Sequence, residues 1–228
     1  MSLRVSERLG LADIMTLLNA TLGVGAMAVA VVGDPDLVAR LLLLAAVADG
    51  LDGIIARSRG GTAVGPYLDS MADIVSFGTA PALFVFVAAR EVWPSFTDNP
   101  ELFVLAAGAG AVFVVFSLVR TALYTVYVDE DENRPGIQNT LAASILAAAY
   151  LAGVTAVPVV LIATMILSVL MVAPVPYPKL KARDALAMGV VQMAAIAAPT
   201  VLERVFPRVL LVAALAYLTL APRYYWGE

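Results

Sequence analysis

Four aspartates lie close together in a part of the chain whose other residues are mostly apolar or small. Asp49 and Asp52 stand three residues apart, which puts both carboxylates on one face of a helix. Asp69 and Asp73 stand four apart, with the same consequence. Carboxylates that converge in a medium of low polarity repel one another, and divalent cations between them remove that repulsion. Four carboxylates can hold two such cations, and a site of oxygen ligands favours Mg²⁺, Mn²⁺ or Ca²⁺.

Small residues and arginines follow the first aspartate pair. Gly53 and Ala56 carry little or no side chain close to Asp52, so a flat base or a sugar can approach the backbone there. Arg57 and Arg59 come next, where guanidinium groups can bind phosphate oxygens. Oxygen-bound cations, small residues and arginines together favour a substrate that carries a diphosphate.

The composition excludes an ordinary soluble protein and several kinds of catalysis. Of the 228 residues, 61% are hydrophobic and 14% are charged, against about 45–50% and about 25% in a typical soluble domain. The chain has no Cys and no His, which excludes disulfides, thiolate zinc sites, cysteine nucleophiles and the usual general base. Acid–base chemistry then falls to Asp, Glu, Lys or Tyr. The net charge of −4 argues against nucleic acid as a partner.

Apolar segments that can form membrane helices position these residues. They cover residues 11–32, 37–57, 68–90, 102–127, 137–153, 157–173, 185–201 and 208–221. A span needs about 20 apolar residues; the first four segments meet this length easily, and the last is short enough to lie partly in the interface. We therefore expect an all-α integral membrane protein with six to eight spans in a single domain, residues 1–228.

The basic residues predict the orientation of the spans in the cell membrane. With both termini in the cytoplasm, four of the 14 Lys and Arg residues fall on the other side, namely Arg40, Arg90, Arg204 and Arg208. The other ten fall on the cytoplasmic side, as the positive-inside rule requires, and the four aspartates lie at that edge. A cation transporter also carries carboxylates in its spans, but it needs them near the midplane on a path that reaches both sides. An enzyme is therefore the stronger interpretation.

The aspartates belong to a longer pattern. The stretch DGLDGIIAR (residues 49–57) is followed by seven residues and then by GPYLDSMAD (residues 65–73). This resembles the signature D-x2-D-G-x2-A-R-x7/8-G-x3-D-x3-D of the CDP-alcohol phosphotransferase family, and all eight fixed positions match. The resemblance implies a six-helix membrane core, with about two extra helices in the less similar part, residues 185–228. It also implies a homodimer, two divalent cations (Mg²⁺ or Mn²⁺), and transfer of a phosphatidyl-type group from a CDP-lipid to an alcohol with release of CMP.

Further stretches resemble the phosphatidylserine and archaetidylserine synthases of that family. These are TLLNATLG (residues 16–23), LDSMADIVSFGTAPA (residues 68–82) and PYPKLK (residues 176–181), the last with Pro where an Arg is usual. Where those synthases read G-L-P-x-P, this chain has GIQNT (residues 136–140). The resemblance implies L-serine as the acceptor and CDP-archaeol or CDP-diacylglycerol as the donor. Glycerol phosphate and inositol phosphate remain as alternative acceptors.

The resemblance also implies roles for single residues. Asp73 is the general base, while Asp49, Asp52 and Asp69 mainly hold metal together with Asp73. The CDP moiety is bound by Asp52 and by four residues of the signature, namely Gly53, Ala56, Arg57 and Gly65.

Five polar residues outside the signature are further candidates. Asn19 contacts either the nucleotide or a neighbouring helix, and Ser76 either lines the acceptor pocket or packs between helices. Arg120, Lys179 and Lys181 are candidates for binding the serine carboxylate, because an amino-acid acceptor needs a cation there. The alternative for the two lysines is interfacial contact with anionic lipid.

Overall fold

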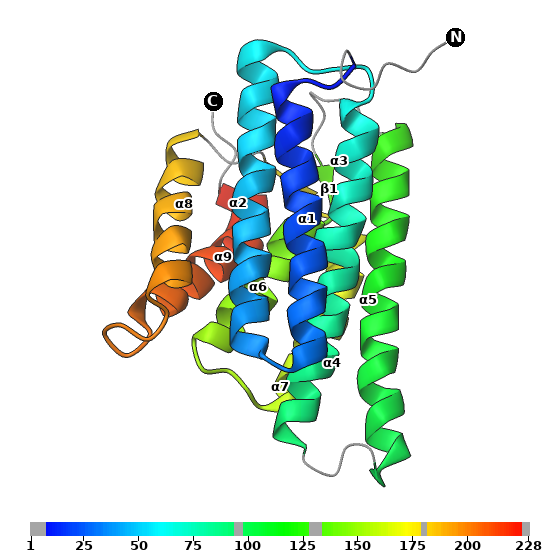
Figure 1. Cartoon of the computed structure of the whole chain (residues 1–228), viewed down its shortest axis with the longest axis vertical. Coiled ribbons are helices and arrows are strands. Elements are labelled where there is room, and N and C mark those ends of the chain that lie inside the picture. Colours follow the sequence, from blue (N-terminus) through cyan, green and yellow to red (C-terminus); the bar gives the residue numbers. More distant parts are fainter. Residues whose placement is uncertain (1–7, 94–97, 128–133, 179–181, 225–228) are drawn as a thin grey trace.

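The computed structural model describes residues 8–93, 98–127, 134–178 and 182–224, and these are almost entirely helical (Figure 1). The helices are α1 (Leu11–Val32), α2 (Pro35–Arg59), α3 (Gly65–Asp73), η2 (Ile74–Thr79), α4 (Ala80–Val92), α5 (Pro100–Tyr127), α6 (Asn139–Leu151), α7 (Val157–Met171), α8 (Ala182–Ala197) and α9 (Val205–Tyr224). Two short strands, β1 (Arg134–Pro135) and β2 (Pro176–Tyr177), pair antiparallel. The all-α architecture predicted from the sequence is confirmed, and every predicted apolar segment coincides with a helix.

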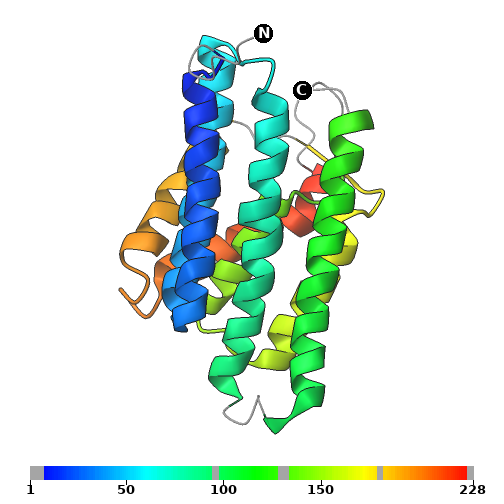
Figure 2. The ribbon, with the colours of Figure 1, turned by 45° about the vertical axis from the view of Figure 1, so that its right-hand side comes forward.

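Turn chemistry fixes the hairpin of α1 and α2. The first helix ends at Gly33, whose φ of 88° is left-handed and suits a residue without a side chain. The second begins at once: the Asp34 side chain accepts a hydrogen bond from the Leu37 backbone N–H, and Pro35 takes the first helical position. The two helices then run antiparallel along the molecule (Figure 2), so the end of α2 lies beside the start of α1.

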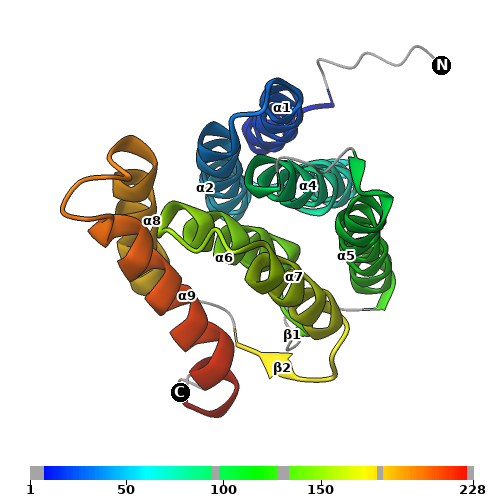
Figure 3. The same ribbon diagram turned by 90° about the horizontal axis from the view of Figure 1, so that it is seen from below.

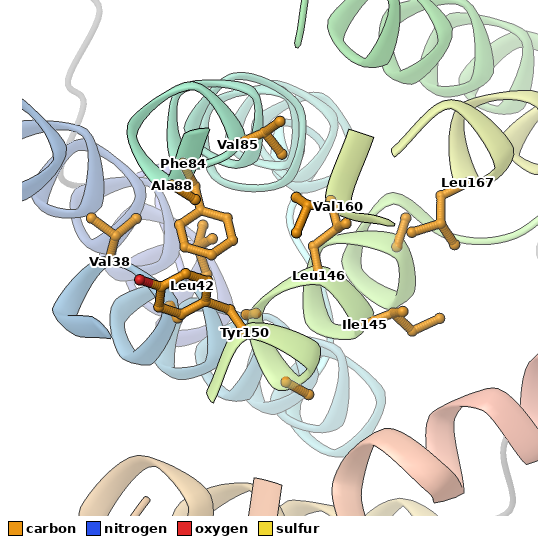
Figure 4. Close-up of a cluster of buried hydrophobic side chains, with 14 of the residues drawn as sticks. Val38, Leu42, Phe84, Val85, Ala88, Ile145, Leu146, Tyr150, Val160 and Leu167 are labelled. Carbon is orange, nitrogen blue, oxygen red and sulfur yellow. The ribbon is translucent and has the colours of Figure 1, made fainter. Parts of the chain in front are cut away.

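The remaining helices surround a shared apolar core. Seen from below, α4 lies beside α1, α5 beside α4, and α6 and α7 fill the space between α2 and α5 (Figure 3). Helices α8 and α9 pack on the outer side of α2 and α6. In the centre, the rings of Phe84 and Tyr150 meet edge to face with centroids 5.3 Å apart, next to Leu42 and Leu146 (Figure 4).

Four helical stretches are long and apolar enough to cross a membrane: α1, the continuous run Gly65–Val92, α5 and α9. Helix α9 has 20 residues, six more than the predicted segment 208–221, and is therefore long enough to span. Helix α2 is long enough, but its charged residues lower its hydropathy. Helices α6 and α7 have 13 and 15 residues, which at 1.5 Å per residue is shorter than the roughly 30 Å of a hydrocarbon core.

A π-helical turn, η2, follows directly after Asp73. It brings small residues against two neighbouring helices. A Cβ on Gly23 of α1 would collide with Ser76, and a Cβ on Gly78 would lie 2.9 Å from the Ser117 hydroxyl of α5. Such turns often mark functional sites. This one packs the C-terminal end of α3 closely between α1 and α5.

Candidate active site

Three of the four aspartates converge. Asp49 of α2 and Asp69 and Asp73 of α3 each place a carboxylate oxygen within 4.8 Å of the others. Their sequence spacing explains this, because α2 and α3 are joined by a short loop and each turns one face toward the other. The buried Oδ1 of Asp73 has no hydrogen-bond partner among the described residues. Carboxylate oxygens grouped in this way fit a divalent cation.

Asp52 has a different neighbour. It is 7% exposed, and its Oδ2 accepts a 2.7 Å hydrogen bond from the Thr16 hydroxyl of α1. The structure therefore does not include Asp52 in the group of three, although it lies less than one turn further along α2.

Helix α1 contacts both aspartates of α2. Thr16 bonds to Asp52, and three residues later the Asn19 amide donates to Asp49 Oδ1 at 3.5 Å. Of the two roles predicted for Asn19, the structure supplies the hydrogen bond between helices. Residues spaced by three share one face of a helix, so α1 presents a polar stripe to the first half of the signature.

A polar cavity of about 160 Å³ opens at the three carboxylates. Its lining comes from α2, α3, α5 and the start of α6, and consists of Asp49, Asp69, Ser70, Asp73, Arg120, Thr121, Tyr124, Thr125, Gln138 and Thr140. Arg120 is only 7% exposed, and its guanidinium lies 4.9 Å from the centre of the Tyr124 ring. One buried cation thus shares a small cavity with three acidic groups.

The segment that departs from the serine synthases, residues 136–140, forms one wall of this cavity. Thr140 donates a 3.2 Å hydrogen bond to Asp49 Oδ2, and the Asn139 amide donates to Thr121 Oγ1 at 2.8 Å. Gly136 fixes the segment: its φ is +75°, and a Cβ there would collide with the Met171 carbonyl. Sequence reasoning marked this segment as unusual but did not identify Thr140 as a partner of Asp49.

The comparisons with known proteins agree with this geometry. A family model described as CDP-alcohol phosphatidyltransferase matches residues 9–177, which include all the cavity residues. The chain belongs to this family. The extent of the match leaves out helices α8 and α9.

Several relatives of this phosphatidyltransferase carry names that specify serine. The chain is 27% identical to the archaetidylserine synthase of Methanothermobacter thermautotrophicus over 179 residues, which is 77% of this chain and 72% of that protein. It is 38% identical to the CDP-diacylglycerol–serine O-phosphatidyltransferase of Mycobacterium tuberculosis over 81 residues, 35% of this chain and 28% of that protein. The protein of that name from Saccharomyces cerevisiae is 34% identical over 130 residues, 54% of this chain and 43% of that protein.

The other signature residues of this phosphatidyltransferase lie on the last turns of α2 and at the start of α3. The exposed Arg57 folds back over Gly53, where a Cβ would lie 3.3 Å from its guanidinium, and Ala56 is half-buried nearby. Gly65 begins α3 in contact with Asp13 and Thr62. The position that a Gly53 side chain would take is therefore next to the Arg57 guanidinium, and the position that a Gly65 side chain would take is next to Asp13 Oδ1.

The four residues predicted to bind the acceptor have different outcomes. Ser76 is fully buried, donates to the Asn19 carbonyl at 2.9 Å and is not part of the cavity lining, so it lies in a helix contact. Lys179 and Lys181 lie outside the described residues. Arg120 is the acceptor candidate that the structure brings to the carboxylates.

Proposed function

We propose that this phosphatidyltransferase transfers a diacylglycerol phosphate or archaeol phosphate group from a CDP-lipid to L-serine and releases CMP. The observation that carries the proposal is the cavity in which three carboxylates and the buried Arg120 occur together. The carboxylates suit the cation-bound diphosphate of the donor, and the guanidinium suits the carboxylate of an amino acid. The names of the relatives support the same acceptor.

The reaction forms one phosphorus–oxygen bond and breaks another. The serine hydroxyl oxygen attacks the lipid-side phosphorus of the diphosphate, and the bond from that phosphorus to the bridging oxygen breaks, so CMP leaves with the bonding electrons. The hydroxyl proton passes to the carboxylate of Asp73, because a neutral hydroxyl is a weak nucleophile and the chain has no His. Asp73 Oδ1 is suited to this role, being buried and without a hydrogen-bond partner among the described residues.

Asp49, Asp69 and Asp73, together with Asp52, would hold two divalent cations, Mg²⁺ or Mn²⁺. Such cations neutralise the charge of the diphosphate and of the leaving CMP. Thr16 and Thr140 each donate a hydrogen bond to one of these carboxylates. These bonds fix the orientation of the side chains before a substrate arrives.

The nucleotide has a place next to the cations. The CDP moiety would approach the backbone at Gly53 and Ala56, where Arg57 supplies a charge for its phosphate oxygens, and Gly65 completes this region at the start of α3. Asp52 borders both the proposed cation site and the proposed nucleotide site. We place this site and both termini on the cytoplasmic side, supported by the distribution of basic residues, and the family resemblance supports a homodimer.

An acceptor screen tests the proposal. Purified protein receives CDP-archaeol or CDP-diacylglycerol with serine, glycerol phosphate or inositol phosphate, and CMP release is measured with Mg²⁺ or Mn²⁺ present. We expect release with serine above that with either phosphate-bearing acceptor. If CMP release depends on glycerol phosphate or inositol phosphate instead, that compound is the acceptor and serine is not. No release with any acceptor, together with cation flux in reconstituted vesicles, would favour a cation transporter.

A further inference from the structure

A buried carboxylate that takes no part in the cavity lies at the start of α1. Asp13 is 1% exposed. Its Oδ2 accepts hydrogen bonds from the Gly10 backbone N–H at 2.7 Å and from the Thr62 hydroxyl at 2.9 Å. The same hydroxyl accepts a 3.1 Å hydrogen bond from the Gly65 backbone N–H. A continuous chain of hydrogen bonds therefore runs from α1 to the first residue of α3.

The contacts around this chain are close on both sides. A Cβ on Gly65 would lie 3.2 Å from Asp13 Oδ1, and a Cβ on Gly10 would lie 3.2 Å from the Thr62 methyl group. Both distances are shorter than ordinary contacts, so the absence of side chains allows the loop to approach the helix. Burying a carboxylate is costly unless it is hydrogen-bonded, and here the bonds come from the loop and from the backbone at the helix start.

The loop that Asp13 holds joins the two halves of the carboxylate site. Asp49 and Asp52 precede it on α2, and Asp69 and Asp73 follow it on α3. On the next turn of α1, Thr16 bonds to Asp52. Helix α1 thus holds both halves: it contacts the first half at Asp52, the start of the second half through Thr62, and the residues after Asp73 through the bond from Ser76 to the Asn19 carbonyl.

We propose that Asp13 and Thr62 form a latch that sets the distance between the two halves of the carboxylate site. Both are positioning residues, and the latch rests on the proposed function insofar as the carboxylates bind divalent cations. Without the latch, the loop loses its anchor, and α3 no longer presents Asp69 and Asp73 at the separation from Asp49 that a cation requires. Affinity for the cation should then fall while the fold persists.

The test compares Thr62→Val, which removes the hydroxyl at nearly constant volume, with Thr62→Ser, which keeps it. The measurement is the Mn²⁺ concentration that half-saturates binding to the substrate-free protein, followed by the loss of the electron paramagnetic resonance signal of free Mn²⁺. Residues bonded directly to metal ligands typically change metal affinity about 10- to 100-fold. Thr62 acts through the start of α3, so we expect Thr62→Val to raise this concentration by up to such a factor and Thr62→Ser to stay near the wild type. Thr21→Val is the matched control, because Thr21 lies on the exposed side of α1 and bonds to its own helix at Leu17.

A double variant tests whether the two residues act together. Asp13→Leu removes both acceptor oxygens and should raise the half-saturating concentration, and adding Thr62→Val should add little, because one bond cannot be lost twice. The latch is overturned if Thr62→Val leaves the concentration unchanged, if Thr21→Val shifts it equally, or if the two changes multiply fully. Should Thr62→Val not fold, Asp13→Leu decides: it keeps the approximate size of the side chain but has no acceptor oxygen, and an unchanged concentration overturns the latch.

The measurement separates the latch from the enzymatic proposal. It uses no lipid and no acceptor, so it reads the cation site alone. If the wild type releases no CMP with any acceptor but its Mn²⁺ response is weakened in Thr62→Val, the latch stands and the proposed reaction falls. If CMP is released normally and Thr62→Val matches the wild type, the reaction stands and the latch falls.

Discussion

Replacing Arg120 should weaken the binding of serine more than the binding of the lipid donor. The guanidinium is 7% exposed and borders the cavity that contains Asp49, Asp69 and Asp73. A hydrogen bond to a charged group contributes about 1.5–3 kcal/mol, and each 1.4 kcal/mol is about tenfold in affinity. Arg120→Gln should therefore raise the KM for serine by about 10- to 100-fold, while the KM for the CDP-lipid changes little.

Arg120 also acts electrostatically on Asp73, so its loss affects the chemical step as well. Arg120→Lys separates the two effects. Lysine keeps the positive charge near Asp73 but lacks the planar pair of donors that binds a carboxylate. We expect Arg120→Lys to restore part of the kcat lost in Arg120→Gln, while the KM for serine stays high.

The assay is CMP release at varied serine with saturating CDP-lipid, followed by the reverse titration. Arg183→Gln is the control, because that arginine is 94% exposed, is paired with Asp184 and lies outside the cavity. The reasoning is refuted if Arg120→Gln leaves the KM for serine unchanged, or if it raises the KM for the CDP-lipid by the larger factor.

Three further outcomes follow from the same geometry. Excess Mn²⁺ should partly rescue Asp52→Asn but not Asp73→Asn, because loss of a general base costs about 10²–10⁴-fold even at saturating metal; equal rescue of both would reduce Asp73 to a metal ligand. Gly136→Ala should lower the free energy of unfolding by at least about 1 kcal/mol, since its φ is +75° and the new Cβ collides with the Met171 carbonyl; chemical denaturation checks this, and an unchanged midpoint contradicts it. In sealed right-side-out vesicles, serine added outside should not react until the membrane is permeabilised. Reaction without permeabilisation would mean that the site faces the other side of the membrane.

Local periodicity was enough to predict the centre of the site. The spacings of Asp49, Asp69 and Asp73 place them on facing sides of two helices that a short loop joins, and the structure brings their oxygens within 4.8 Å. The apolar segments likewise predicted where the helices lie. The last helix begins at Val205, three residues before the predicted segment, because proline at position 207 is tolerated in the first turn of a helix.

Contacts between distant parts of the chain could not be predicted. Thr140 bonds to Asp49 across 91 positions, and Thr62 bonds to Asp13 across 49. Nothing in the sequence around either threonine distinguishes it from a threonine on the surface, because its role depends on how the helices pack. Ser76 shows the converse: the sequence allowed either a pocket or a helix contact, and the π-helical turn directs it toward Gly23 of α1.

The metal dependence of CMP release tests the central claim most directly. Purified protein with CDP-lipid and serine is assayed first in excess EDTA and then after addition of Mg²⁺ or Mn²⁺. Three carboxylates this close repel a diphosphate unless cations lie between them, so we predict no release in chelator and recovery with either ion. Full activity in chelator without any divalent ion would contradict the assignment of these aspartates as a metal-dependent phosphatidyl-transfer site.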